Sequence, residues 1–234
     1  MVLFCIANEC QPFTVLDLDS SEERGGTSLS NPAEAQLALH LYHNLCRDTN
    51  GLCSQSRVAV ITPYAQQANL LRRVFSQNLG DSFGKAVEVN TVDAFQGREA
   101  NIVIFSCVRA AGSHGIGFLS DVRRMNVALT RAKHFLFVIA RCRSIVVNPY
   151  WRDLVAHAHE TNAVVPVPHH SGGGGGGGGI GVMISPTSRV YRSPVNSRSM
   201  RRRLRGTGCD IRAAMATATA GEIRRHPLLM VWRS

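Results

Sequence analysis

Two long apolar runs place the strongest constraint on the fold of this chain. Asn101–Val108 reads NIVIFSCV and His134–Ala140 reads HFLFVIA, so neither run alternates polar with apolar residues. Strands of this kind are covered on both faces, as they are in a parallel sheet. Asp121–Ala132, between the two runs, has the apolar spacing of a helix. The pattern therefore predicts an α/β fold, with a parallel sheet and helices on both of its faces.

The same alternation extends from residue 12 to residue 160. Further strands are predicted at Pro12–Leu18, Arg57–Ile61 and Val87–Thr91, and further helices at Ala33–Arg47, Ala65–Leu79 and Tyr150–Glu160. A polar segment that ends at Asn31-Pro32 is expected to form a loop after the first strand. Strands that alternate with helices are typical of one parallel-sheet domain, which we place at residues 1–165.

A change in composition separates this domain from the rest of the chain. Residues 172–179 are eight consecutive glycines, whose backbone is too flexible to hold one conformation. We therefore predict that residues 166–234 form a disordered tail rich in Gly and Arg. The tail also holds the basic excess, because residues 172–234 carry a net charge of +9 and residues 1–171 only +1. The charge therefore says little about the function of the folded part.

The cysteines and histidines form no pattern that predicts a metal site. The seven cysteines are odd in number and contain no CxxC pair, which favours free thiols in a reducing compartment. No apolar run approaches the roughly 18 residues that a membrane helix needs. The first ten residues also lack the basic start of a signal peptide. We expect an intracellular protein that has no membrane partner and no resident metal.

The first segment with candidate chemistry is VAVITPYAQ, in which an apolar strand breaks at Thr62-Pro63-Tyr64. Residues at the carboxyl ends of parallel strands face the ligand crevice. A hydroxyl group and an aromatic ring at this position suit backbone contact and base stacking with a single nucleic-acid strand. The alternative interpretation is a simple turn at the end of a strand.

The second segment is VNTVDAFQGREA, a polar turn between two predicted strands. Gly97 allows a close backbone approach to a phosphate, and Glu99 can accept a hydrogen bond from a ribose hydroxyl or a metal-bound water. The third segment is RRMNVALTRAK, in which Arg131 could stabilise the charge of a transferring phosphoryl group. The alternatives are a surface loop for the second segment and a solvated helix face for the third.

These segments, in this order, resemble the second motor lobe of superfamily-one helicases in the nonsense-mediated-decay and senataxin branch. TVDAFQGRE is similar to motif V, within residues 89–100, and RRMNVALTRAK is similar to motif VI, within residues 121–133. ITPYAQQ resembles the segment that opens this lobe, and the closing PYWRDLVAHA is more similar to the senataxin members of the branch than to the others. The resemblance covers about residues 10–160. It implies a C-terminal RecA-like lobe of an ATP-driven motor on single-stranded RNA or DNA.

The resemblance also implies a role for individual residues. Arg131 corresponds to the arginine finger and Glu99 to a second catalytic position, while Gly97, Arg98 and Arg124 correspond to residues that line or support the nucleotide cleft. An ion-pair role for Arg124 remains open. Positions near the nucleic-acid backbone are occupied by Thr62, Tyr64 and Thr91. The cofactor implied is ATP, with Mg²⁺ held mainly by another lobe.

The parts of such a motor that bind most of the ATP are absent from this sequence. No GxxxxGK[ST] phosphate loop occurs, and Gly84-Lys85 is followed by Ala86 rather than Ser or Thr. We therefore expect no ATPase activity from the chain alone and a partnership with an N-terminal RecA-like lobe, in the same or another chain. The alternatives are a non-catalytic nucleic-acid-binding module, which uses the lobe and the Arg-rich tail, and a decayed or wrongly delimited gene product. The senataxin resemblance favours RNA and the nucleus.

Overall fold

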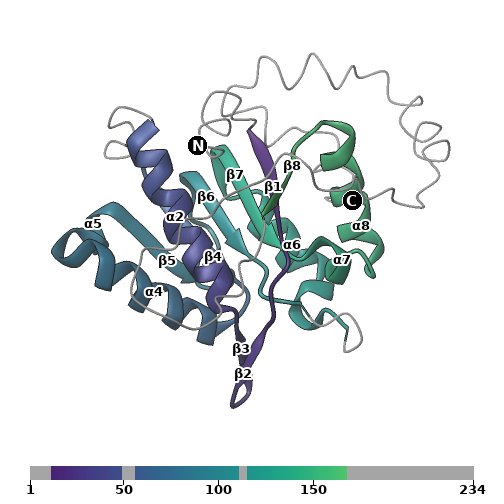
Figure 1. Ribbon diagram of the computed structural model, residues 1–234, viewed down its shortest axis with the longest axis horizontal. Helices are drawn as coiled ribbons and strands as arrows, with labels where there is room; N and C mark the ends of the chain where they lie inside the picture. The colour runs from purple at the N-terminus through teal and green to yellow at the C-terminus, as the bar shows by residue number, and fades with distance from the viewer. Residues whose placement is uncertain (1–11, 49–55, 111–114, 168–234) are drawn as a thin grey trace, which may run out of the picture.

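A six-stranded parallel sheet organises the part of the chain that the computed structural model describes, which is residues 12–48, 56–110 and 115–167 (Figure 1). In spatial order the strands are β5 (Val87–Thr91), β4 (Val58–Thr62), β6 (Ala100–Ser106), β7 (Ala132–Ala140), β1 (Phe13–Leu18) and β8 (Val164–Val167). Every neighbouring pair of strands is parallel. The predicted α/β, RecA-like architecture is confirmed.

Helices cover both faces of the sheet, as predicted. One face is covered by α2 (Pro32–Asp48) and α4 (Ala65–Leu79), and the other by α6 (Val122–Leu129), α7 (Cys142–Ile145) and α8 (Pro149–Glu160) (Figure 1). Strand β4 shows why this fold needs two helical layers. Val58 and Val60 pack with the α2–α4 layer, whereas Ala59 and Ile61 pack with the α6–α8 layer. A strand that is apolar at every position is buried on both sides.

Two predictions about local structure are wrong, and one strand was not predicted. The polar segment predicted as a loop contains a hairpin of two short antiparallel strands, β2 (Glu23–Gly25) and β3 (Ser28–Ser30). The helix predicted at Asp121–Ala132 is shorter, because Asp121 is its N-cap and Thr130 its C-cap. Strand β8 was not predicted, and its bounds cross the boundary expected at residue 165. Short helical turns also occur at η1 (Gly80–Ser82), α5 (Phe83–Ala86) and η3 (Gly117–Ser120).

The predicted tail lies outside the described residues, apart from the two that end β8. Within the described ranges, no helix combines the length and the apolar content that crossing a membrane requires. The same ranges contain no cluster of three or more His, Cys, Asp or Glu side chains arranged for a metal ion.

Parallel strands give the sheet two chemically distinct ends. The carboxyl end of the sheet is where all six strands finish, and the amino end is where they start. Residues 92–99 connect these ends, since they run from the last residue of β5 back to the first residue of β6. Val92 and Phe95 anchor this connection in the core, with 2% and 0% exposure. The connection matters because the candidate site residues fall at both of its ends.

Candidate functional site

The predicted nucleotide-binding residues gather at the amino end of the sheet. Gly97, Arg98 and Glu99 come directly before β6, and Arg131 comes directly before β7. Because β6 and β7 are neighbours, the two turns meet. The Ala100 amide donates to the Arg131 carbonyl at 3.1 Å, and Nη1 of Arg131 donates to the Arg98 carbonyl at 3.3 Å. The structure therefore brings motif V and motif VI together through backbone and side-chain contacts.

The Arg131 guanidinium is held in place from several directions. Its Nε donates to the Val127 carbonyl at 2.9 Å, and its Nη2 donates to the Thr130 hydroxyl at 2.9 Å. The Val127 carbonyl lies in the last turn of α6, where backbone carbonyls lack partners within the helix, and Thr130 is the C-cap of that helix. The side chain is half-buried. A guanidinium fixed beside an open turn is a suitable donor to an oxyanion.

The turn that faces Arg131 has an open surface. Gly97 has φ +78°, a left-handed conformation that side chains other than glycine rarely adopt, and nothing lies within 4 Å of the position a Cβ would take. Glu99 is partly exposed, and its Oε2 lies 3.8 Å from Nζ of Lys133. The amino end thus combines cations, a carboxylate and an accessible backbone. This set of groups fits the phosphates and sugar of a nucleotide.

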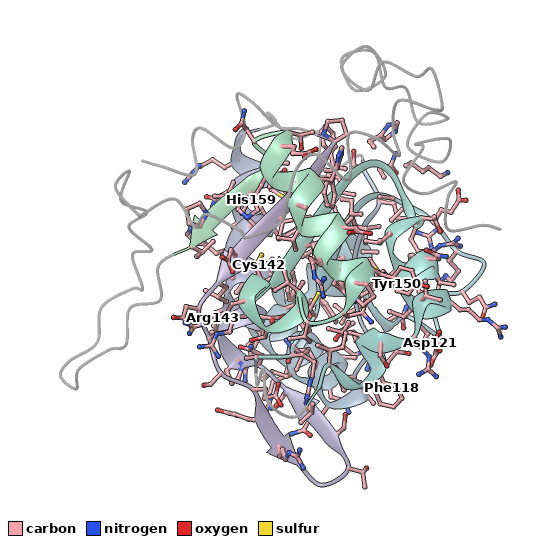
Figure 2. The ribbon with its side chains drawn as sticks, turned by 90° about the vertical axis from the view of Figure 1, so that its right-hand side faces the viewer. Phe118, Asp121, Cys142, Arg143, Tyr150 and His159 are labelled. Atoms are coloured by element: carbon pink, nitrogen blue, oxygen red, sulfur yellow. The ribbon has the colours of Figure 1, made fainter. Side chains whose placement is uncertain are left out.

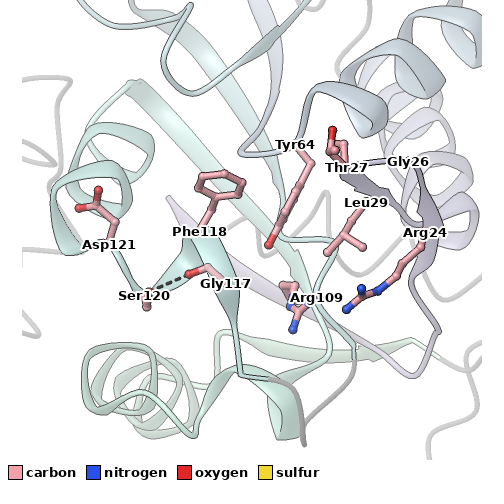
Figure 3. A pocket seen from close by; sticks show the side chains of 11 residues that line it. Arg24, Gly26, Thr27, Leu29, Tyr64, Arg109, Gly117, Phe118, Ser120 and Asp121 are labelled. Carbon is pink, nitrogen blue, oxygen red and sulfur yellow. Dashed lines mark hydrogen bonds between the residues drawn. The ribbon is translucent and has the colours of Figure 1, made fainter.

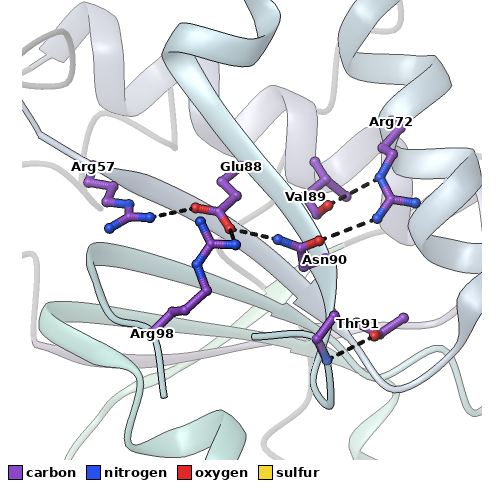
Figure 4. A network of polar contacts seen from close by, with 8 residues as sticks. Arg57, Arg72, Glu88, Val89, Asn90, Thr91 and Arg98 are labelled. Carbon is purple, nitrogen blue, oxygen red and sulfur yellow. Dashed lines mark hydrogen bonds and ion pairs between the residues drawn. The ribbon is translucent and has the colours of Figure 1, made fainter. Parts of the chain in front are cut away.

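The Arg98 side chain extends toward Glu88 of β5 (Figure 4). Its Nη1 lies 2.5 Å from Oε1 of Glu88. Oε1 also accepts from Nδ2 of Asn90 at 2.6 Å, and Oε2 of Glu88 accepts from Nη2 of Arg57 at 2.9 Å. The guanidinium lies 5.6 Å from the centre of the Phe95 ring. Arg98 therefore fixes the motif V turn against β5, and its carbonyl is the group that contacts Arg131.

Arg124 makes the ion pair that the sequence left open. Its Nε lies 3.1 Å from Oδ1 of Asp93, and its guanidinium lies 4.9 Å from the centre of the Phe118 ring. Asp93 belongs to the connection between the two ends of the sheet. Arg124 thus joins α6 to this connection, and a supporting role in the nucleotide cleft stays a prediction.

The predicted nucleic-acid-binding residues lie at the carboxyl end of the sheet. Thr62 and Thr91 are the last residues of β4 and β5 and are partners in the parallel register. Thr62 is fully buried, and its carbonyl accepts from the Val92 amide at 2.9 Å. The Thr91 hydroxyl accepts from the Ala94 amide at 3.3 Å. The predicted nucleic-acid-binding residues and the predicted nucleotide-binding turn therefore lie at opposite ends of the connection formed by residues 92–99.

Tyr64 differs from the expectation that its ring stacks on a base. The residue is 3% exposed, and burial raises the pKa of its hydroxyl to about 12. Its ring packs nearly perpendicular to that of Phe118, with the centroids 5.5 Å apart. A ring buried to this extent offers no open face for stacking. Base stacking is therefore not available to the Tyr64 ring, and its contact with the nucleic-acid backbone stays a prediction.

Glu34 is an important residue that sequence reasoning did not single out. Its carboxyl group is fully buried and accepts from the Ser106 hydroxyl at 2.6 Å and from the Val108 amide at 2.9 and 3.0 Å. Burial raises its pKa to about 8. Val108 has φ +69°, a strained value for a β-branched residue. Glu34 therefore holds the chain as it leaves β6. The only sequence signal was an acidic residue three positions after Asn31 at a helix start.

A buried ion pair, also not predicted, follows at the same end of the sheet. Nη1 of Arg109 lies 2.7 Å from Oε1 of Glu22, and the two side chains are 5% and 9% exposed. Oε2 of Glu22 accepts from the Ala110 amide at 2.7 Å. Because Glu22 precedes the β2–β3 hairpin, this pair fixes the hairpin to the segment after β6.

Comparison with known proteins decides the family. A family model described as AAA domain matches residues 3–143. Helicase sen1 of Schizosaccharomyces pombe is 37% identical over 147 residues, and senataxin of Homo sapiens is 37% identical over 157. ATP-dependent helicase NAM7 of Saccharomyces cerevisiae is 40% identical over 142 residues. The chain belongs to this family, within the senataxin and nonsense-mediated-decay branch of superfamily-one helicases.

The helicase relatives are much longer than the matched region. The aligned residues are 62% of this chain and 9% of Helicase sen1, 66% and 6% for senataxin, and 60% and 14% for NAM7. The chain thus spans a small part of the relatives that it matches. Family membership supports helicase-domain function.

Proposed function

We propose that this chain is the C-terminal motor lobe of an ATP-dependent helicase that acts on single-stranded RNA or DNA. The observation that carries the proposal is the position of Arg131. Its guanidinium is fixed beside the turn of Gly97, Arg98 and Glu99, at the start of two adjacent central strands. An arginine presented in this way stabilises the charge that develops on a transferring phosphoryl group.

In this proposal the amino end of the sheet faces a bound nucleotide. Arg131 donates to the terminal phosphate, the Gly97 backbone lies against the nucleotide, and Glu99 accepts from its sugar or from a metal-bound water. ATP, when bound, supplies the phosphoryl group whose transfer to water drives the motor. The phosphate loop and most of the Mg²⁺ ligands would come from an N-terminal RecA-like lobe, in the same or another chain. The lack of a GxxxxGK[ST] motif in this sequence supports that division.

The nucleic-acid strand would cross the carboxyl end of the sheet, near Thr62, Tyr64 and Thr91. Residues 92–99 would then link the nucleic-acid strand to the nucleotide, because they directly follow Thr91 and end at Glu99. This direct connection suits a motor whose grip on a strand changes with the state of its nucleotide.

The size and the ATPase activity of the native polypeptide test this proposal. An antibody raised against residues 100–160 would be used to purify it, to measure its size and to assay its RNA-stimulated ATPase activity. We expect a protein, or a complex, larger than 25.5 kDa that hydrolyses ATP, whereas the recombinant 234-residue chain does not. ATP hydrolysis by the recombinant chain alone, abolished by Arg131→Ala, would contradict the need for a second lobe.

The Arg-rich tail favours a second candidate function, a non-catalytic nucleic-acid-binding module. Residues 172–234 contain 11 Arg, Asp210 and Glu222, which is a strong excess of positive charge. Contacts with phosphates give binding that weakens steeply as salt rises. This candidate predicts that deletion of residues 172–234 removes most of the affinity and most of the salt dependence. Affinity that survives the deletion would count against it.

A further inference from the structure

A cavity at the carboxyl end of the sheet lies apart from the amino-end residues. Its volume is about 410 Å³, near the lower end of the range for small-molecule pockets, roughly 300–1,000 Å³. Figure 3 shows its walls: the β2–β3 hairpin with Gly26, Thr27 and Leu29 on one side, Phe118 and Asp121 on the other, and Tyr64 and Arg109 between them. The cavity has room for one base with its sugar rather than for several.

Phe118 stands at the rim of this cavity with its ring half-exposed. Its exposure is 49%, whereas Tyr64 beside it is 3% exposed. The ring is nevertheless fixed, because the Tyr64 ring packs nearly perpendicular to it and the Arg124 guanidinium lies 4.9 Å from its centre. An aromatic ring held from two sides and still open to solvent loses little conformational entropy when a flat partner stacks on it.

The charges around the cavity favour a base over a phosphate. Arg109 is neutralised by Glu22 at 2.7 Å, and the remaining charged residues of the lining, Arg24 and Asp121, have opposite signs. Thr27 and Ser28 of the hairpin add hydroxyl groups, which can pair with the edge of a base or with a ribose. A polyphosphate would find no net positive charge here, whereas a neutral aromatic base would find a ring and hydrogen-bonding groups.

We propose that Phe118 is a stacking platform for one base of bound single-stranded RNA, and that the edge of this base and its sugar enter the adjacent cavity. This inference rests on the proposed function, since it needs a strand that crosses the carboxyl end of the sheet. It assigns base contact to Phe118 in place of the buried ring of Tyr64. Stacking on one aromatic ring tolerates any base, so the contact grips the strand without selecting its sequence.

The test compares the binding of two labelled probes to the full 234-residue chain: a short oligouridylate and an abasic ribose-phosphate strand of the same length. Fluorescence anisotropy gives the affinity of each probe. We expect Phe118→Ala to weaken oligouridylate binding by roughly five- to a hundredfold and to leave abasic binding unchanged. Phe118→Tyr keeps an aromatic face and should retain the affinity of the unmodified chain.

Tyr150→Ala is the matched control. Tyr150 is another exposed aromatic residue, with 43% exposure, and it does not line the cavity. Tyr150 lies in the first turn of α8 (Figure 2), whereas Phe118 belongs to η3. The control variant should bind both probes as the unmodified chain does. A circular dichroism spectrum of Phe118→Ala that matches the spectrum of the unmodified chain shows that this variant is folded.

Two other outcomes overturn the inference, and they are distinguishable. Equal binding of both probes by the unmodified chain, or an equal loss for both probes in Phe118→Ala, would remove the stacking role and leave strand binding intact. Failure of the unmodified chain to bind either probe would remove strand binding itself, and the stacking role with it.

Discussion

The Arg131 guanidinium donates to the Arg98 carbonyl at 3.3 Å, and beside this contact the Arg131 carbonyl accepts from the amide of Ala100, the first residue of β6, at 3.1 Å. The turn before β6 and the turn before β7 are therefore in contact at the amino end of the sheet. A change in either turn displaces the other.

Substitution of Arg131 should separate catalysis from folding. In a motor completed by an ATP-binding lobe, Arg131→Ala should lower the rate of ATP hydrolysis by about 10³-fold or more, because an arginine finger contributes on that scale. Its lost hydrogen bonds should cost only about 1–2 kcal/mol of unfolding free energy. Arg123→Ala, which removes an exposed arginine from α6, the helix that precedes Arg131, is the control. Similar turnover in the two variants would exclude the finger role.

Any side chain at position 97 should lower the free energy of unfolding. Its φ of +78° makes Gly97→Ala unfavourable by about 1 kcal/mol, although the space around it is open. Gly84→Ala is a matched control, since Gly84 lies in α5 and also has open space around it but no positive φ. Urea unfolding should show a loss of stability for Gly97→Ala and none for Gly84→Ala. Equal effects would mean that backbone strain is not the cause.

Glu34 should make the stability of the domain depend on pH. Burial raises its pKa from an ordinary value near 4.5 to about 8, so the folded protein holds a proton that the unfolded chain releases between these values. The free energy of unfolding should therefore fall as pH rises through this window, by up to about 1.4 kcal/mol per pH unit. Below the window both states are protonated, and above it both are ionised, so the effect is confined to the window.

Glu34→Gln isolates this contribution. Urea unfolding of the two proteins at several pH values should give a difference in stability that changes across the window, because only the carboxyl group titrates. Glu160→Gln, at an exposed position, should show no such change. A constant difference between Glu34→Gln and the unmodified chain would mean that Glu34 is ionised in the folded protein throughout.

The Glu22–Arg109 pair should be costly to break. Glu22→Gln leaves the Arg109 charge buried without its partner carboxylate, and the loss of one member of a buried pair costs about 3–5 kcal/mol. The exposed pair of Arg143 and Asp19, with side chains 55% and 64% exposed, provides the contrast. Arg143→Ala should cost less than about 1 kcal/mol. Equal losses of unfolding free energy in the two variants would show that burial does not govern these pairs.

Much of the architecture could be predicted from periodicity. Ala65–Leu79 and Val87–Thr91 have the predicted bounds, because each carries a full apolar pattern between clear breaks. The β2–β3 hairpin could not be predicted in this way. Glu23–Gly25 is exposed at all three positions, so its order comes from pairing with β3 and from the adjacent Glu22–Arg109 ion pair rather than from its own apolar pattern.

The sequence predicted individual residues of the candidate site better than it predicted how these residues pack against one another. Local motifs indicated Arg131 and Gly97, and their position before two strands places them at the amino end of the sheet. The burial of Tyr64 and the exposure of Phe118 depend on how the η3 segment packs against β4 and α4, which no local pattern encodes. Glu34 was missed for a similar reason, since its partners Ser106 and Val108 lie more than 70 residues away.

The order of the strands also bears on self-association. Strands β5 and β8 flank the described sheet, and an unpaired flanking strand can capture the same strand of a second molecule. Pro166 in β8 has no backbone N–H to offer to a new strand. On the other flank, Glu88 in β5 is held by Arg57 and Arg98, which places charged groups where an incoming strand would have to pack. Both flanks of the sheet therefore carry features that oppose its growth into fibrils.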